Sequence, residues 1–214
     1  MRIVFASAFL LILFGAPCRA LTQAVPSARL KSGEDLYAEL CALCHGNEGE
    51  GYLVEGAPAL RNQDFLAAVT DEFLFAAIAS GRRGTKMSAW SVRAEGPLED
   101  VQIHALVNFL RNWQSVPSVE LNDRSTIIGS ISEGARTYRV NCSECHGENG
   151  RALGAPDLNN AEFLKTASDG FIRYAIVHGR RDTPMKAFAN ELTLTQIDDL
   201  VAFIRSWENE AHYD

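Results

Sequence analysis

The chain has 214 residues, of which 47% are hydrophobic and 22% are charged, as in an ordinary soluble globular protein. Its formal net charge is −7 at pH 7, and acidic residues outnumber basic ones in both halves of the sequence. A nucleic-acid binder needs a basic patch, so the charge pattern argues against a nucleic-acid partner and is explained most simply by solubility.

Residues 1–20 have the pattern of an export signal. Arg2 precedes an apolar run over residues 3–14, and Cys18-Arg19-Ala20 is a tolerable cleavage site. This run is short for a membrane span, which needs about 20 residues. We expect a cleaved signal, with a retained anchor or a lipid on Cys18 as the alternative. Either places the protein in the periplasm or on the outer face of the cytoplasmic membrane, and the second would attach it to that membrane.

Residues 33–45 are predicted to form a helix that runs into the motif Cys41-Ala-Leu-Cys44-His45. Cys-x-x-Cys-His is the attachment signature of a c-type haem. Cysteines three apart lie on one side of a helical turn, so both sulfurs can form thioethers with one porphyrin edge. The motif therefore predicts that Cys41 and Cys44 hold a haem and that His45 ligates its iron.

Two more helices are predicted before the middle of the chain. Residues 70–81 read as a helix that ends at a glycine, and a polar loop then leads to Met87. Pro97, followed by acidic residues, suits the start of the next helix, which has apolar residues at the spacing of one helix face. These are Ile103, Leu106, Val107 and Leu110.

The chain then repeats itself. Residues 117–129 are polar, contain Pro117 and Gly129, and are predicted to be a linker between domains at residues 30–116 and 130–210. The second copy begins with a helix over residues 134–146 that runs into a second motif. That motif places Cys142 and Cys145 as attachment points of a second haem, and His146 as its iron ligand.

The later helices also recur. Residues 168–179 match residues 70–81, and a final helix carries Ile197, Leu200, Val201 and Ile204 on one face, with Thr195 and Asp198 resembling a capping box. No convincing alternating strand is present, so the fold class is expected to be all-α.

Methionine supplies the candidates for the second iron ligand. The chain contains three methionines, and the first is the initiator. Met87 and Met185 occupy equivalent places in the repeat, which a methionine used only to fill a core gap has no reason to do. We predict that both are axial ligands. The other histidines, His104, His178 and His212, are not duplicated and are expected to be structural or on the surface.

Other uses of paired cysteines fit less well. A thioredoxin-like redox motif requires a strand and a helix around it, and no strand is expected here. Zinc ribbons usually place their cysteine pairs about 15–20 residues apart, far closer than these two motifs.

On these motifs, each copy resembles a class I c-type cytochrome domain, and the whole is similar to tandem dihaem cytochromes c. The resemblance implies two helical domains, each enclosing one covalently bound haem c. It also implies that a proline carbonyl accepts a hydrogen bond from each ligand histidine, a role that falls on Pro58 and Pro156. Many members have proline directly after the axial methionine. Here Ser88 and Lys186 take that place, while Trp90 and Phe188 keep the aromatic residue found further on.

The resemblance further implies that the first helix of each domain packs on the last, with glycine against an aromatic ring. Gly33 and Gly134 fit the glycine role. Their expected partners are Phe109 or Trp113 in the first domain, and Phe203 or Trp207 in the second.

A pair of arginines precedes each methionine: Arg82 and Arg83, and Arg180 and Arg181. Guanidinium groups pair well with carboxylates, so a contact to haem propionates is one interpretation. A solvated loop charge is the other.

Iron held by both histidine and methionine has no open site and changes oxidation state with little movement. We therefore expect an electron carrier rather than an enzyme. Its donor would be a quinol-oxidising complex or a dehydrogenase, and its acceptor an oxidase, a reductase or a photosynthetic reaction centre. The alternatives are a dihaem redox enzyme, such as a thiosulfate dehydrogenase or peroxidase, and a cytochrome fixed within an oxidoreductase complex.

Overall fold

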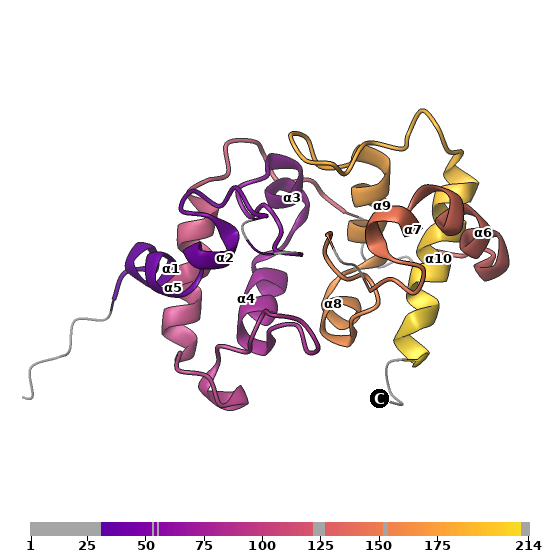
Figure 1. Cartoon of the computed structure of the whole chain (residues 1–214). Helices are drawn as coiled ribbons and strands as arrows, with labels where there is room; N and C mark the ends of the chain where they lie inside the picture. The colour runs from indigo at the N-terminus through magenta and orange to yellow at the C-terminus, as the bar shows by residue number, and fades with distance from the viewer. Residues whose placement is uncertain (1–30, 53, 55, 122–126, 152–153, 211–214) are drawn as a thin grey trace, which may run out of the picture. The chain divides into compact units, whose positions relative to one another are not determined.

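The structure, a computed structural model, describes residues 31–52, 54, 56–121, 127–151 and 154–210. Its helices occur along the chain as α1 Gly33–Leu40, α2 Ala42–His45, α3 Gln63–Ala68, α4 Asp71–Ser80, the short 3-10 helix η1 Val92–Ala94, α5 Asp100–Arg111, α6 Ile131–Asn141, α7 Ser143–His146, α8 Ala161–Thr166, α9 Asp169–His178 and α10 Leu194–Glu210 (Figure 1).

The all-α fold class is confirmed. In the described residues, the only extended pairing is an isolated bridge between Ser91 and Leu98. None of the described helices is both long and apolar enough to cross a membrane. The expected export signal at residues 1–20 lies outside the described part of the chain.

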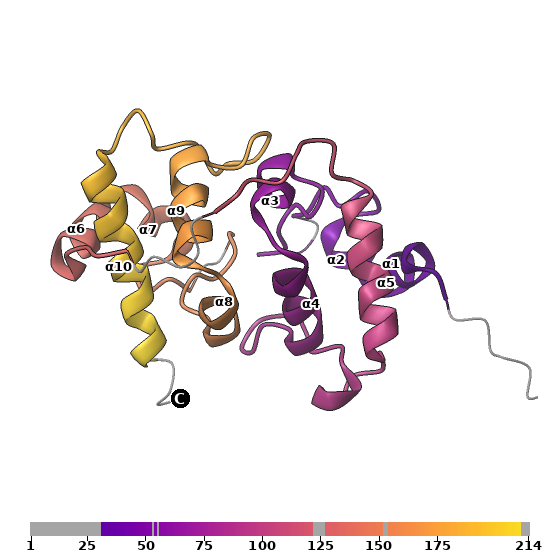
Figure 2. The ribbon, with the colours of Figure 1, turned by 180° about the vertical axis from the view of Figure 1, so that it is seen from behind.

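The sequence repeat is also a structural repeat. Helices α1 to α5 of residues 31–121 (the first half) recur as α6 to α10 of residues 127–210 (the second half). Both halves belong to one compact unit, Lys31–Asp214. Within each half the first helix packs on the last, α1 on α5 and α6 on α10, and both views show these pairs side by side (Figures 1 and 2).

Glycine permits this close helix packing. A Cβ atom added to Gly33 would lie 2.1 Å from the carbonyl oxygen of Ala105 and 2.9 Å from Cβ of Phe109. One added to Gly134 would lie 2.0 Å from the carbonyl oxygen of Asp199 and 2.7 Å from Cβ of Phe203. Phenylalanine, rather than tryptophan, is therefore the aromatic neighbour in both halves.

The two tryptophans pack elsewhere. A Cβ atom on Gly49 would lie 2.6 Å from Trp113, and one on Gly150 would lie 2.6 Å from Trp207. These glycines both have φ +72°, a left-handed conformation that disfavours other residues. Each tryptophan thus covers the loop after a cysteine motif.

Three local features differ from the expectations. Helices α3 and α8 were not predicted; each has only six residues, too few for an apolar period to emerge. Helix α6 starts at Ile131, earlier than expected, because Ser130 caps it. The predicted capping box of the last helix is wrong, since Thr193 and Gln196 exchange the capping hydrogen bonds two residues earlier.

An arginine at the end of α5 and one within α10 tie the short helices to the long ones. Arg111 donates to the carbonyl oxygens of Leu66 and Val69, at 2.7 Å each. The equivalent Arg205 donates to the carbonyl oxygens of Leu164 and Ala167. Because these carbonyls lie at the ends of α3 and α8, each arginine satisfies acceptors that a helix end leaves free.

Candidate haem-binding sites

Each cysteine motif begins where one helix ends and a short second helix starts. Helix α1 ends at Leu40, Cys41 lies between the two helices, and α2 takes the chain to His45. The buried Tyr37 fixes the backbone just beyond this histidine, because its hydroxyl donates to the carbonyl oxygen of Gly46 at 2.7 Å. Tyr138 makes the same bond to Gly147 at 2.8 Å.

Sequence reasoning missed these two tyrosines. They stand at equivalent places in the two copies, so the repeat itself contained the signal. Each hydroxyl fixes the chain directly after the motif histidine.

Each motif histidine is oriented by a proline carbonyl. Nδ1 of His45 lies 3.0 Å from the carbonyl oxygen of Pro58, and Nδ1 of His146 lies 3.1 Å from that of Pro156. A carbonyl oxygen can only accept, so Nδ1 carries the proton in both rings. The lone pair of each neutral imidazole is therefore on Nε2, the atom that a metal would bind. The hydrogen bonds implied by the family resemblance are present, while iron ligation stays a prediction.

Burial keeps both imidazoles neutral. The side chain of His45 is buried, and this desolvation lowers the pKa, although the Pro58 hydrogen bond acts in the opposite direction. His146 has a lowered pKa for the same first reason, opposed by Pro156 and by the charge of Asp157. A neutral ring is the form that ligates iron.

The first cysteine of each motif is held as a protonated thiol. Cys41, Cys44, Cys142 and Cys145 are all free. Burial raises the pKa of Cys41 to about 11, with a further contribution from Cys44, and does the same for Cys142 beside Cys145. A redox-active or metal-binding cysteine has a lowered pKa. In the described part of the chain, no three His, Cys, Asp or Glu residues gather as a metal cluster would require.

The two methionines end closed loops of the same design. In the first half, the Arg82 N–H donates to the carbonyl oxygen of Met87 at 2.8 Å, and the Thr85 hydroxyl donates to the carbonyl oxygen of Arg82 at 2.7 Å. The Met87 N–H in turn donates to Oγ1 of Thr85 at 3.1 Å.

The second half repeats this ring of bonds with Arg180, Thr183 and Met185, at 2.8, 2.7 and 3.2 Å. These hydrogen bonds stiffen loops that lack the family's proline after the methionine. The nearby aromatic residue anchors the exit of each loop, since Trp90 N–H donates to the carbonyl oxygen of Ile78 and Phe188 N–H to that of Ile176.

The first arginine of each pair, Arg82 or Arg180, lies against an aromatic ring. The guanidinium carbon of Arg82 lies 5.6 Å from the ring centre of Phe73, and that of Arg180 lies 5.4 Å from Phe171. Burial lowers the pKa of both arginines to about 10. A freely solvated loop charge is therefore the wrong description of these two. A contact to haem propionates stays a prediction for them.

The two other described histidines, His104 and His178, each pack against an aromatic ring. The ring of His104 lies 4.8 Å from Phe75, and that of His178 lies 4.3 Å from Tyr174. His212 falls outside the described residues.

Comparison with known proteins agrees with the duplicated site. A family model described as "Cytochrome C oxidase, cbb3-type, subunit III" matches residues 28–110 and matches again at residues 129–204. Together these two matches cover well over half of the chain.

Several curated proteins are similar along most of the chain. A cbb3-type cytochrome c oxidase subunit FixP of Bradyrhizobium sp. (strain ORS 278) is 26% identical over 192 residues, which are 86% of this chain and 62% of the relative. A subunit CcoP of Azospirillum brasilense is 27% identical, covering 83% of this chain and 61% of its own length. A cytochrome bc1 complex cytochrome c subunit of Mycobacterium bovis is 23% identical, covering 91% and 69%. The chain thus spans about three fifths of the length of the first two relatives.

Among solved structures, the reducing HAO-like protein complex of Kuenenia stuttgartiensis contains a similar chain. Its TM-score is 0.52 at 21% sequence identity, with 82% of this chain and 94% of that chain covered, which supports the fold. With the family model matched twice and the motifs in register, the chain belongs to the family of cbb3-type cytochrome c oxidase subunit III and is a tandem c-type cytochrome with two covalently bound haem c groups.

Proposed function

We propose that the chain carries single electrons through two six-coordinate haems. In the first half, Cys41 and Cys44 would attach the porphyrin, with His45 and Met87 on the two sides of the iron. In the second half, these roles fall to Cys142, Cys145, His146 and Met185. The bound haem supplies the reversible change in iron oxidation state. The protein would attach it through the motif cysteines, and the oriented histidines and the two methionines would hold the iron.

One observation carries this proposal more than any other. Both motif histidines have Nδ1 fixed by a proline carbonyl, so each is prepared to ligate through Nε2. Histidine and methionine together leave no open position for peroxide or oxygen, and methionine raises the potential. That combination favours electron transfer over substrate turnover.

The partners are proposed to be respiratory complexes. The similar curated proteins are named as subunits of a cbb3-type oxidase and of a bc1 complex. We infer that electrons arrive from a quinol-oxidising complex or a dehydrogenase and leave to an oxidase; a reductase or reaction centre is a less supported acceptor. The net charge of −7 suits basic docking surfaces, with an association that weakens as salt rises. With such partners, the proposed location is the periplasm or the outer face of the membrane, where an uncleaved N-terminus would attach the protein.

A redox titration of the exported holoprotein, monitored by optical and magnetic spectra, tests the proposal. We expect two low-spin, six-coordinate haems and two one-electron steps. A high-spin haem that turns over peroxide or a sulfur substrate would instead establish the enzyme alternative.

A fixed subunit is the second candidate, because the relatives are named as subunits of complexes. Affinity purification from the native membrane separates the two possibilities. A stoichiometric complex that survives high salt indicates a fixed subunit, and a protein recovered alone indicates a shuttle.

A further inference from the structure

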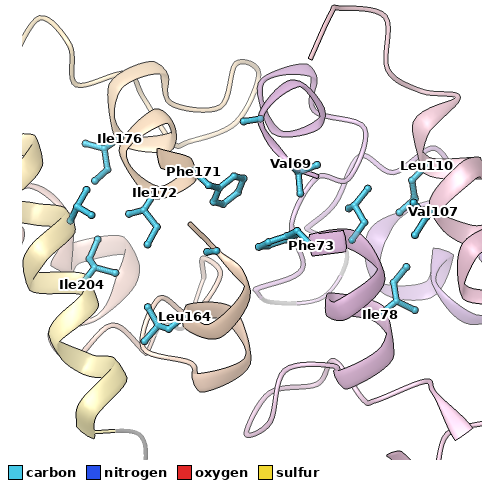
Figure 3. Close-up of a cluster of buried hydrophobic side chains, with 14 of the residues drawn as sticks. Val69, Phe73, Ile78, Val107, Leu110, Leu164, Phe171, Ile172, Ile176 and Ile204 are labelled. Carbon is cyan, nitrogen blue, oxygen red and sulfur yellow. The ribbon is translucent and has the colours of Figure 1, made fainter. Parts of the chain in front are cut away.

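The two halves touch through a set of contacts that cross from one to the other. Phe73 and Phe171 point toward one another with ring centres 5.1 Å apart (Figure 3). Around them, Phe65 lies 6.3 Å from Phe171 and Phe163 lies 6.5 Å from Phe73. Phe65 and Phe163 are equivalent in the repeat, as are Phe73 and Phe171. The contacts are therefore reciprocal, as in an interface with two-fold symmetry.

Polar contacts beside these rings reach into the methionine loop of the opposite half. Asn62 donates from Nδ2 to the carbonyl oxygen of Arg181 at 2.7 Å. Asp64 accepts from the N–H of Arg181 at 2.8 Å, and its Oδ1 lies 3.0 Å from Nη2 of the same guanidinium. Two side chains of the first half thus bind both the N–H and the carbonyl oxygen of Arg181 in the second half.

The second half returns the contact. Asn160 donates from Nδ2 to the carbonyl oxygen of Arg83 at 2.9 Å, and Glu162 accepts from the N–H of Arg83 at 3.2 Å. In each half the contacted arginine comes directly after the one whose N–H is bonded to the methionine carbonyl, Arg82 or Arg180.

The asparagines are well suited to this task. Each uses its amide oxygen to cap its own helix, Asn62 by accepting from Phe65 N–H and Asn160 by accepting from Phe163 N–H. The cap fixes the orientation of the amide group, so the nitrogen faces the opposite half.

We infer that each half positions the methionine loop of the other: Asn62 and Asp64 act on the loop that carries Met185, and Asn160 and Glu162 act on the loop that carries Met87. The inference rests on the proposed ligation of iron by these methionines. It makes the four side chains positioning residues for the distant haem, not for the haem of their own half.

The test uses the full-length ferric holoprotein and imidazole as a probe, because imidazole binds the iron only when the methionine leaves. Serine can still cap a helix but lacks the amide donor, so Asn62→Ser and Asn160→Ser form a matched pair. NMR separates the two haems, with signals assigned through Met87→Leu and Met185→Leu. Asp71→Asn, which removes an ion pair to Arg111 within the first half, is the control.

We expect Asn62→Ser to increase imidazole binding at the haem of the second half by roughly threefold to tenfold, the range that one lost hydrogen bond allows. The haem of the first half should be unchanged. Asn160→Ser should increase imidazole binding at the haem of the first half and leave the haem of the second half unchanged. The control, Asp71→Asn, should leave imidazole binding at the haem of the second half unchanged. A stronger effect on the haem of the mutated half, an equal effect on both, or no effect would overturn the inference.

A second measurement does not depend on ligation. Amide hydrogen exchange at Arg181 should accelerate in Asp64→Ala, and exchange at Arg83 should accelerate in Glu162→Ala. Unchanged exchange would show that the crossed contacts are absent. If exchange responds but the wild-type haems show no methionine ligation, the proposed function fails while the contact itself stands.

Discussion

The two halves hold each other's methionine loops with the same asparagine but with different acids. Asp64 reaches Arg181 through the backbone and the guanidinium at 2.8 to 3.1 Å, and its side chain is 9% exposed. Glu162 meets Arg83 at 3.2 and 3.4 Å, and its side chain is 15% exposed. The arginine side chain is 90% exposed in this pair, against 68% for Arg181 in the other. Solvent screens the second pair more, so the loop of Met185 is held more firmly than that of Met87.

A repeated sequence therefore need not give two equal sites. The cysteine motifs, the histidine–proline bonds and the methionine loops are nearly identical in geometry, whereas the contacts that cross between the halves are not. Variants made in matched pairs can separate the properties that the two halves share from those that distinguish them.

The largest expected effect comes from removing one attachment site. Cys41→Ala with Cys44→Ala should abolish one covalent haem and leave the other, and Cys142→Ala with Cys145→Ala should do the same in the second half. Mass spectrometry and a haem stain on a denaturing gel measure the change from two haems to one. Loss of both haems from either variant would mean that the halves do not mature independently.

The next effect concerns the potential. Met87→His and Met185→His should each lower one of the two reduction potentials by on the order of 0.1 V, because methionine ligation raises the potential and axial ligands span about 0.8 V. A spectroelectrochemical titration gives both values. If one substitution leaves both potentials in place, that methionine is not a ligand.

Alanine at the helix-crossing glycines should destabilise both halves. The added Cβ atom would meet a carbonyl oxygen of the last helix, so Gly33→Ala should cost about 1–3 kcal/mol. Gly134→Ala should cost less, because its position inside α6 gains up to about 1 kcal/mol of helix propensity. Denaturant unfolding of the holoprotein measures both.

Gly154→Ala is the control, since no atom lies within 4 Å of its added Cβ. Equal stability in all three variants would contradict the packing described for the two helix pairs.

A smaller difference is expected at the acids beside Arg111 and Arg205. Asp71 is 60% exposed in its pair with Arg111, whereas Asp169 is 17% exposed with Arg205 and also accepts from the Ile127 N–H. Asp71→Asn should therefore cost under about 1 kcal/mol, and Asp169→Asn about 1–3 kcal/mol. Thermal unfolding at neutral pH ranks them, and the reverse order would refute the burial argument.

The smallest expected effect is a change in the pH dependence of the free energy of unfolding. Burial alone would raise the pKa of Asp64, but the hydrogen bonds and charge of Arg181 outweigh it and hold the pKa below the ordinary value of 3.8. A carboxyl with a lowered pKa stabilises the fold above its ordinary pKa and loses that contribution as pH falls through the lowered pKa. Wild type should therefore lose more stability than Asp64→Asn below pH 3.8. Parallel stability curves for the two proteins would count against the Arg181 contact.

Much of each site could be predicted from the sequence because its signals are local or duplicated. The cysteine motifs specify their own chemistry, the repeat singled out Met87 and Met185, and the family resemblance indicated Pro58 and Pro156. Tyr37 and Tyr138 carry the same kind of signal, since they stand at the same place before each motif.

The contacts between the halves could not be predicted. Asn62 and Asn160 look like ordinary helix caps, and Asp64 and Glu162 look like ordinary charges in a first turn. Their second partners lie far away along the chain, and alignment of the copies does not say whether a residue contacts its own loop or that of the other copy.

The reciprocal contacts around Phe73 and Phe171 have a consequence for the origin of the chain. A single copy that paired with itself about a two-fold axis would form every crossed contact twice with one sequence. In a homodimer, a mutation changes both crossed contacts at once. After gene duplication and fusion, the two copies lie in one chain and each crossed contact can change separately. Asp64 and Glu162 could diverge in this way. The two haem sites could then come to differ in how firmly their methionine loops are held, without any change in either cysteine motif.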